Sequence, residues 1–332
     1  MNQVTFVGAG RWALALALRL HANGCRVSLW EQNADNLARF TTTRLHPDLP
    51  LAEPVPADIK VTGSLGEALA GCEAVVFAVP SPCLAENAGL VRKHLGKCRS
   101  IITVTKGLDP KTLKRMSPVL GQAFPDSPVV VLAGPGIPYD VVRGDPTSLV
   151  AASEDGPAAE FTRDLFTGGN LRVYSHGDVV GVELGAALKN VIAIAAGIAD
   201  GLGLGINARA ALVTRGLAEI IRLGLTLNAN PMTFAGLSGM GDLIVTSFSE
   251  NSRNHTLGLH IGRGMSPNEA AAMLHGVAEG AVTCLTAGEL ARRQRVEMPI
   301  TEEVYRIVHE AAAPGEALDR LLRRKPKPEI WQ

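Results

Sequence analysis

A chain of 332 residues exceeds the size at which one hydrophobic core usually stops growing, so we expect two domains. Its 46% of hydrophobic and 19% of charged residues are typical of an ordered globular protein and argue against a disordered chain. The 32 Lys and Arg balance the 32 Asp and Glu, and only the C-terminal tail has a basic cluster, so we expect no nucleic-acid binding.

The five cysteines are odd in number and form no C-x-x-C pair, which argues against a zinc knuckle and a disulfide framework. We therefore expect reduced thiols, no metal site and a cytoplasmic protein without a signal peptide. The apolar run over residues 191–206 contains Asp200 and several glycines. It predicts a buried core helix and no membrane insertion.

The first half of the chain alternates short apolar runs with helix-type segments, which predicts a parallel sheet covered on both faces. We expect strands over residues 4–7, 26–30, 74–79, 100–105 and 129–132. Two further strand-like runs, 147–152 and 171–174, flank an expected helix over 158–166 and extend the same sheet.

After Asp178 the strand-type runs end, and Ala/Leu/Ile-rich segments follow. We therefore expect an α/β protein: a Rossmann-type, doubly wound parallel sheet over residues 1–178 and an all-helical C-terminal domain over 179–332. Within that second domain Ser266-Pro-Asn-Glu269 predicts a helix start, with Ser as N-cap, Pro at the first position and Glu at the third.

A glycine-rich turn, Gly8-Ala-Gly10-Arg-Trp-Ala13, joins the first expected strand to an Ala/Leu-rich helix. In a dinucleotide-binding turn the first Gly allows the tight bend and the second lets the backbone approach the pyrophosphate. The third small residue lets helix and strand pack closely, and the helix N-terminus supplies N–H groups to the anion. The segment therefore predicts binding of NAD or NADP.

Glu31 follows the second expected strand, where an acidic residue hydrogen-bonds the hydroxyls of the adenine ribose. A carboxylate at that place repels a 2′-phosphate, so we expect NAD to be preferred, with NADP possible. The alternative is that Gln32 occupies this place and Glu31 is solvated. Arg11 could also offer positive charge to a phosphate.

Lys189 is the only formal charge between Glu183 and Asp200, in an otherwise apolar helical segment. Burial disfavours an ammonium, so a lysine on a packed helix either has a carboxylate partner or a lowered pKa, which makes it a candidate general acid/base. The alternative is a lysine at the helix rim whose ammonium reaches water.

Seven motifs occur in this order along the chain: Gly8-x-Gly10-x-Trp12, Lys106-Gly-Leu108, Gly134-Pro135, Lys189-Asn190, Gly239-Met-Gly-Asp-Leu243, Ser252-Arg-Asn254 and Val277-Ala-Glu-Gly280. Together they resemble the bacterial NAD(P)-dependent glycerol-3-phosphate dehydrogenase family, over residues 4–305. The resemblance implies reversible hydride transfer between a nicotinamide and the central carbon of dihydroxyacetone phosphate. The product would be sn-glycerol 3-phosphate, a precursor of glycerophospholipids.

The resemblance also implies roles for single residues. Lys189 would be the general acid/base, Lys106 would contact both substrate and cofactor, and Asp242 would orient a lysine or accept a substrate hydroxyl. The ammonium of Lys106 would lower the pKa of Lys189 by like-charge repulsion. The other implied substrate-binding residues are Gly134, Gly136 and, for the phosphate, Ser252, Arg253 and Asn254. The implied cofactor-binding residues are Gly8, Gly10, Arg11, Trp12, Glu31, Gln32, Lys106, Pro138, Arg253, Val277 and Glu279.

The sequence departs from the family pattern after its Gly-Pro pair. Gly136 lacks the hydroxyl that the family has there, and Pro138 has no N–H to donate to the cofactor. Residues 41–60 also diverge. Two other functions therefore stay open: a related dehydrogenase acting on another small hydroxy or keto phosphate or acid, and a dinucleotide-binding sensor without catalysis. We expect a small phosphorylated substrate as partner and a homodimer formed through the apolar helical half.

Overall fold

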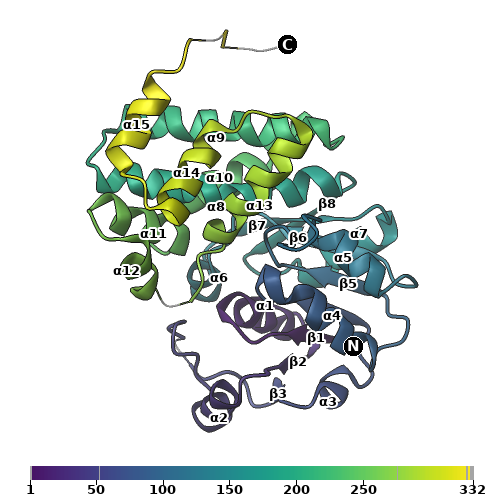
Figure 1. Ribbon diagram of the computed structural model, residues 1–332. Helices are drawn as coiled ribbons and strands as arrows, with labels where there is room; N and C mark the ends of the chain where they lie inside the picture. The colour runs from purple at the N-terminus through teal and green to yellow at the C-terminus, as the bar shows by residue number, and fades with distance from the viewer. Residues whose placement is uncertain (1, 52, 275, 327, 330–332) are drawn as a thin grey trace.

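The protein is described by a computed structural model that covers residues 2–51, 53–274, 276–326 and 328–329. An α/β domain lies in the lower half of Figure 1 and a helical domain in the upper half. The strands are β1 (Gln3–Val7), β2 (Arg26–Trp30), β3 (Lys60–Thr62), β4 (Ala74–Phe77), β5 (Ser100–Thr103), β6 (Val129–Ala133), β7 (Thr147–Ala152) and β8 (Leu171–His176).

The eight strands form one sheet in the order β3-β2-β1-β4-β5-β6-β7-β8. Every neighbouring pair is parallel except β6 and β7, which run antiparallel. The expected Rossmann-type sheet is thus confirmed, although the sequence pattern did not indicate the reversal at β7 or the short strand β3. Strand order reverses between β1 and β4, and in such sheets dinucleotides bind outside the carboxyl ends of the strands at this point.

Alternating side chains of the strands enter two different cores. Phe6 belongs to a cluster with α1 (Arg11–Ala22) and α7 (Gly156–Phe166), whereas Val7 belongs to one with α4 (Leu84–Arg92) and α5 (Met116–Ala123). The same alternation places Val76 on the first face and Phe77 on the second. This period of two explains why the apolar runs of the sequence predict the strands well. The helices on the two faces are α1 (Arg11–Ala22), α2 (Ala34–Thr43), α3 (Leu65–Leu69), α4 (Leu84–Arg92), α5 (Met116–Ala123), α6 (Pro138–Arg143) and α7 (Gly156–Phe166).

The second half of the chain is helical, as expected. Its helices are α8 (Val179–Gly201), α9 (Ile206–Thr226), α10 (Asp242–Phe248), α11 (Arg253–Gly262), α12 (Pro267–Ala272), α13 (Glu279–Gln294), α14 (Pro299–Glu310) and α15 (Pro314–Leu322). The helix start predicted at Ser266 is confirmed: Ser266 and Glu269 form a capping box with Pro267 at the first position of α12. The 178/179 domain boundary stays a prediction.

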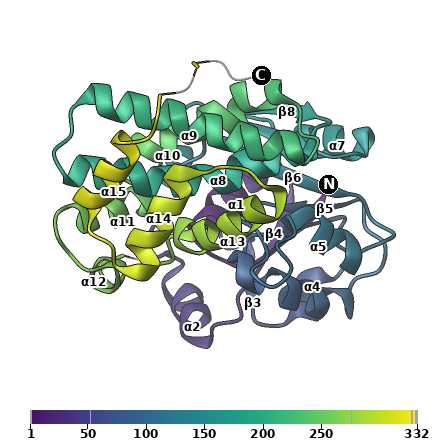
Figure 2. The same cartoon turned by 45° about the horizontal axis from the view of Figure 1, so that its top comes forward.

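Helix α8 lies between the sheet and α9 in both ribbon views (Figures 1 and 2). Its first turns pack on the sheet, where Val179, Val182 and Ala186 share a core cluster with Val131 of β6 and Val150 of β7. Within the described residues it is the one helix long and apolar enough to cross a membrane by length and composition. Because 89% of the apolar window is buried inside the protein, α8 is a core helix. The run expected as one helix over residues 191–206 is interrupted: α8 ends at Gly201 and Ile206 begins α9.

Helices α8 and α11 cross at backbone contact. A Cβ at Gly197 of α8 would overlap the carbonyl of His255, and one at Gly258 of α11 would overlap the carbonyl of Ile194. One turn further along, a Cβ at Gly201 would meet the carbonyl of Leu259 at 2.6 Å. Small residues four apart on both helices therefore permit an approach that no larger side chain would allow.

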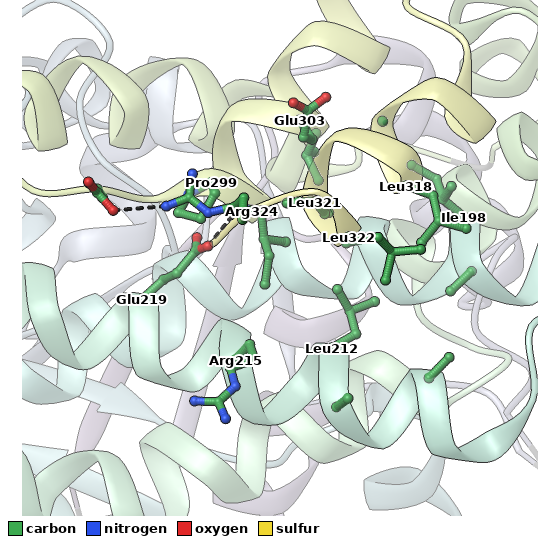
Figure 3. A pocket seen from close by; sticks show the side chains of 18 of the residues that line it. Ile198, Leu212, Arg215, Glu219, Pro299, Glu303, Leu318, Leu321, Leu322 and Arg324 are labelled. Atoms are coloured by element: carbon green, nitrogen blue, oxygen red, sulfur yellow. Dashed lines mark hydrogen bonds and ion pairs between the residues drawn. The ribbon is translucent and has the colours of Figure 1, made fainter. Parts of the chain in front are cut away.

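A cavity of about 890 Å³ lies between α8, α9, α14 and α15. Figure 3 shows its apolar walls, with Ile198 and Leu212 facing Leu318 across the space, and the carboxylate of Glu219 at one end. Glu219 Oε1 accepts the backbone N–H of Ile300 at 2.6 Å, which holds the first turn of α14 against α9. Burial raises the pKa of Glu219 to about 7. The catalytic candidates Lys106, Lys189 and Asp242 are absent from its described lining.

We expect Gly258→Ala to destabilise the protein by about 3 kcal/mol, because the added methyl must push apart two backbones in a packed core. Urea unfolding followed by circular dichroism measures the loss. Gly288→Ala is the matched control, because Gly288 lies inside α13 with no atom within 4 Å of its Cβ position. The control should gain up to about 1 kcal/mol from helix propensity. Equal stability of the two variants would show that the crossing is loosely packed.

Candidate active site

The turn between β1 and α1 is shaped for a close anionic ligand. Gly8 has φ +101°. A Cβ at this position would lie 2.9 Å from the carbonyl oxygen of Ala78, in the loop that follows β4, so only glycine fits. At Gly10, which precedes α1, no atom lies within 4 Å of the Cβ position. No side-chain hydrogen bond caps the start of α1 in the described structure. An open approach to uncapped helix N–H groups suits the pyrophosphate of a dinucleotide.

Glu31 lies at the carboxyl end of β2, beside this turn. Its backbone N–H donates to the carbonyl of Thr62 at 3.1 Å, and its Oε1 accepts the N–H of Asn33 at 2.8 Å. The carboxylate is thereby held at the start of α2. The side chain of Gln32 is exposed. Of the two residues considered for the ribose, Glu31 is the one with a defined orientation.

Lys189, Lys106 and Asp242 come together in one buried cluster. Lys189 is 4% exposed and Asp242 is fully buried. The Nζ of Lys189 contacts Oδ1 of Asp242, and the Nζ of Lys106 lies 2.9 Å from Oδ2 of the same carboxylate. Lys189 is therefore a core residue, and the alternative of a lysine at the helix rim is wrong.

Glycines bring the carboxylate to the lysine. Asp242 begins α10 directly after a wide helical turn, Leu237–Gly241, that packs against α8. A Cβ at Gly185, one helical turn before Lys189, would meet the carbonyl oxygen of Ser238 in that turn at 2.6 Å. Gly239 is equally constrained, because a Cβ there would overlap the carbonyl of Phe234. Larger side chains at these positions would hold Asp242 away from Lys189.

Thr246 is a member of this cluster that the sequence reasoning missed. Its hydroxyl accepts a hydrogen bond from Lys189 Nζ at 2.6 Å. Thr246 follows Asp242 by four residues on α10, so the two side chains share one helix face. That spacing was the available signal in the sequence.

The electrostatics of the cluster favour proton exchange at Lys189. Burial lowers the pKa of Lys189 to about 7; the Asp242 carboxylate opposes this change and the Lys106 ammonium adds to it. The expected like-charge effect of Lys106 is confirmed in direction, although burial is the larger cause. An ammonium with a pKa near neutrality can both donate and accept a proton.

The first turn of α11 carries the expected phosphate motif. Ser252 is the N-cap, with its Oγ accepting the N–H of His255 at 3.3 Å. Arg253 is exposed at the surface. Partial desolvation of its guanidinium lowers its pKa, the Arg11 guanidinium from the other domain lowers it further, and the Glu279 and Asp48 carboxylates oppose this change. A guanidinium beside a helix start suits a bound anion.

The side chain of Asn254 makes two hydrogen bonds to other residues of the helical domain. Its Nδ2 donates to Oδ1 of Asn190 at 3.0 Å, and its Oδ1 accepts the N–H of Gly280 at 2.9 Å. The amide therefore ties α11 to α8 and to the start of α13. Each bond uses one of the two N–H groups of Nδ2 or one of the two lone pairs of Oδ1, so the amide keeps a donor and an acceptor for the substrate contact that the motif implies.

Glu279 joins the two domains at the start of α13. Its Oε2 accepts a hydrogen bond from the hydroxyl of Ser81, which follows β4, at 3.0 Å. Burial raises the pKa of Glu279. Val277, two residues earlier, is exposed, and a Cβ at Gly276 would meet Nη1 of Arg253 at 2.9 Å. The segment with the implied nicotinamide residues therefore lies against the phosphate motif.

The loop after β6 differs from the family pattern for a visible reason. A Cβ at Gly136 would meet the ring of Trp12 at 2.5 Å, so the indole fills the space that a serine or threonine side chain would need. Gly134 has φ +136°, which favours glycine, and Pro138 is the first residue of α6. The first N–H groups of any helix have no partner within that helix, so the absence of an N–H at Pro138 removes no hydrogen bond of α6.

Comparisons with known proteins agree with this arrangement. The N-terminal sequence profile of NAD-dependent glycerol-3-phosphate dehydrogenase matches residues 3–159, and the C-terminal profile matches residues 178–319. A glycerol-3-phosphate dehydrogenase [NAD(P)+] from Pelotomaculum thermopropionicum is 44% identical over 97% of this chain and 93% of its own length. The protein of that name from a Thermoanaerobacter species is 43% identical over 99% of both chains.

Among solved structures, the crystal structure of glycerol-3-phosphate dehydrogenase from Coxiella burnetii superposes with a TM-score of 0.94 at 34% identity, covering 97% of this chain and 99% of that one. Profile, sequence and structural similarities extend over both domains. The chain therefore belongs to the NAD-dependent glycerol-3-phosphate dehydrogenase family.

Proposed function

We propose that the protein reversibly reduces dihydroxyacetone phosphate to sn-glycerol 3-phosphate with NADH or NADPH, in the supply of glycerophospholipid precursors. The observation that carries the proposal is the buried contact of two lysine ammoniums, Lys189 and Lys106, with one carboxylate, Asp242. The same structure has a glycine turn shaped for a pyrophosphate after β1 and a helix start that carries Ser252 and Arg253, which support the proposal. Relatives over the full length bear the corresponding name.

Each part of the cluster has a role in this reaction. The turn at Gly8 and Gly10 and the segment around Glu279 would hold the reduced nicotinamide cofactor, which would supply the hydride for the central carbon of the ketone. Lys189 donates its proton to the carbonyl oxygen as that oxygen becomes a hydroxyl, and Lys106 stabilises the negative charge that develops there. Asp242 and Thr246 orient the Lys189 ammonium. In the reverse direction neutral Lys189 accepts the hydroxyl proton. Arg253 and the N–H groups of α11 bind the phosphate.

The first experiment is the oxidation of NADH, and separately of NADPH, by the purified protein with dihydroxyacetone phosphate, followed by absorbance. We expect turnover with both and the higher kcat/KM with NADH. Cofactor binding without turnover on this ketone, but with turnover on another phosphorylated or carboxylated ketone, would favour the related-dehydrogenase alternative. Binding without turnover on any ketone would favour the sensor.

We expect Lys189→Met to lower kcat for ketone reduction by about 10²- to 10⁴-fold, because the general acid is lost. Fluorescence titration should give an unchanged affinity for NADH. Lys111→Met, at an exposed position, is the matched control with unchanged kcat. A loss of less than about tenfold in Lys189→Met would contradict the assignment of Lys189 as the acid.

The same assignment predicts a pH dependence. Reduction needs the protonated lysine, and burial lowers the pKa of Lys189 to about 7. The kcat for reduction should therefore fall as pH rises through about 7, while the kcat for oxidation of sn-glycerol 3-phosphate should rise. Lys106→Met removes a like charge and should move both limbs to higher pH.

We propose that Glu31 makes NAD the preferred cofactor. The oriented carboxylate at the end of β2 supports this proposal, because it would accept ribose hydroxyls and repel a 2′-phosphate. Glu31→Gln keeps the shape and removes the charge. It should lower the NADH/NADPH ratio of kcat/KM by about tenfold, which corresponds to about 1.4 kcal/mol. Gln32→Ala is the control; if only this variant changed the ratio, Gln32 would be the ribose residue.

We also propose a homodimer formed through the helical domain and a cytoplasmic location. Met240, in the turn before α10, and Ile244 and Phe248 of α10 are exposed at a spacing of four residues, and the two α10 residues lie on the side opposite Asp242 and Thr246. An exposed apolar ridge of this kind supports self-association. Light scattering should give twice the mass of the chain, and a monomer mass would contradict the proposal. Cell fractionation tests the location.

A further inference from the structure

A partly buried, hydrogen-bonded cluster outside the reacting groups joins three helices of the second domain. Asp200 lies in the last turn of α8, Arg209 in the first turns of α9, and His255 in the first turn of α11. Oδ2 of Asp200 lies 2.7 Å from Nε2 of His255, and its Oδ1 accepts a hydrogen bond from Nη1 of Arg209 at 2.9 Å. The imidazole is 8% exposed, so Asp200 is its partner in the interior.

The cluster holds α11 at a second point of its crossing with α8. The backbone carbonyl of His255 lies against Gly197 of α8, and its side chain reaches Asp200 three residues further along the same helix. A backbone contact and a side-chain contact from one residue restrict both the sliding and the rotation of the first turn of α11. Arg209 in turn holds the Asp200 carboxylate in place.

The first turn of α11 is also the phosphate motif. Ser252 accepts the N–H of His255, Arg253 directly precedes Asn254 and His255, and the helix N–H groups point out of the same turn. The reacting groups are held by other contacts, because Asp242 and Thr246 reach Lys189 from α10. A change at His255 therefore moves the phosphate-binding turn and leaves the proton-transfer groups in place.

We propose that Asp200, His255 and Arg209 form a positioning tether that presents the first turn of α11 to the phosphate of the substrate. This inference rests on the proposed function. The tether determines how tightly the phosphate is bound and has no part in the hydride or proton transfer. Asp200 and His255 are positioning residues that act through Arg253 and the helix N–H groups.

The test compares two ketones in His255→Phe, which removes the bond to Asp200. We expect KM for dihydroxyacetone phosphate to rise about tenfold or more, the scale of a lost hydrogen bond to a charged group. The kcat should stay within about twofold, and kcat/KM for dihydroxyacetone, which lacks the phosphate, should not change. His255→Gln, which can still donate to Asp200, should restore most of the affinity.

Glu303→Gln is the matched control. Glu303 is a buried carboxylate of the same domain that binds Arg306 and Arg320 at the junction of α14 and α15, remote in sequence from α11. The Glu303→Gln substitution should lower the free energy of unfolding and leave KM unchanged for both dihydroxyacetone phosphate and dihydroxyacetone. An equal fall in kcat/KM for both ketones in His255→Phe would overturn the proposal, because the cluster would then support the whole domain.

Calorimetric titration of inorganic phosphate into the wild type, His255→Phe and Asp200→Leu, which removes both acceptor oxygens, needs no turnover. We expect phosphate to bind about tenfold more weakly to both variants. Unchanged phosphate affinity in the folded Asp200→Leu protein would refute the tether. Failure of the wild type to reduce dihydroxyacetone phosphate would instead refute the proposed reaction, and the titration would still decide the tether.

Discussion

The burial of one lysine ammonium is the constraint on which this structure depends. Lys189 lies within the apolar centre of α8, and an unpaired charge in such a place costs several kcal/mol. The carboxylate of Asp242 compensates it, and Lys106 reaches the same carboxylate. Two ammoniums and one carboxylate leave a net positive charge in the interior. The stability of the core and the chemistry of the site therefore arise from the same contact.

That contact exists because backbones approach closely around α8. Gly185 and Gly239 let the turn before α10 press against α8, so that Asp242 reaches Lys189. Gly197 and Gly258 let α11 lie against the other end of α8. One helix thus sets the positions of the proposed proton-transfer groups, the proposed phosphate-binding turn and the sheet packed on its first residues. Such packing tolerates little change of side-chain volume at its glycines.

The two domains meet where the expected ligands have their charges. The Arg253 guanidinium is influenced by Arg11 of the other domain, which lowers its pKa, and by the Glu279 carboxylate, which raises it. Glu279 also accepts a hydrogen bond from Ser81 of the first domain. Charged groups of both domains therefore meet around the first turns of α11 and α13.

Local patterns in the sequence determined the elements and much of the site. Alternation over the strands, the glycine turn after β1 and the Ser266 capping box involve residues within a few positions of each other, so they can be predicted without the fold. Lys189 could be recognised by its apolar surroundings, and Thr246 by its spacing from Asp242. The resemblance of ordered motifs supplied the roles of Lys106, Asp242 and Arg253.

Only the tertiary structure decided which groups meet. Lys189 and Asp242 are 53 residues apart and Lys106 and Asp242 are 136 apart, so no local rule pairs them. Three other features likewise depend on long-range packing: the hydrogen bond of the Asn254 amide to Asn190, the contact of the Trp12 indole with Gly136, and the antiparallel direction of β7. The physical reason is that a buried polar group must find its partner among whatever residues the fold brings near, whereas strand alternation and helix capping are satisfied within a single segment.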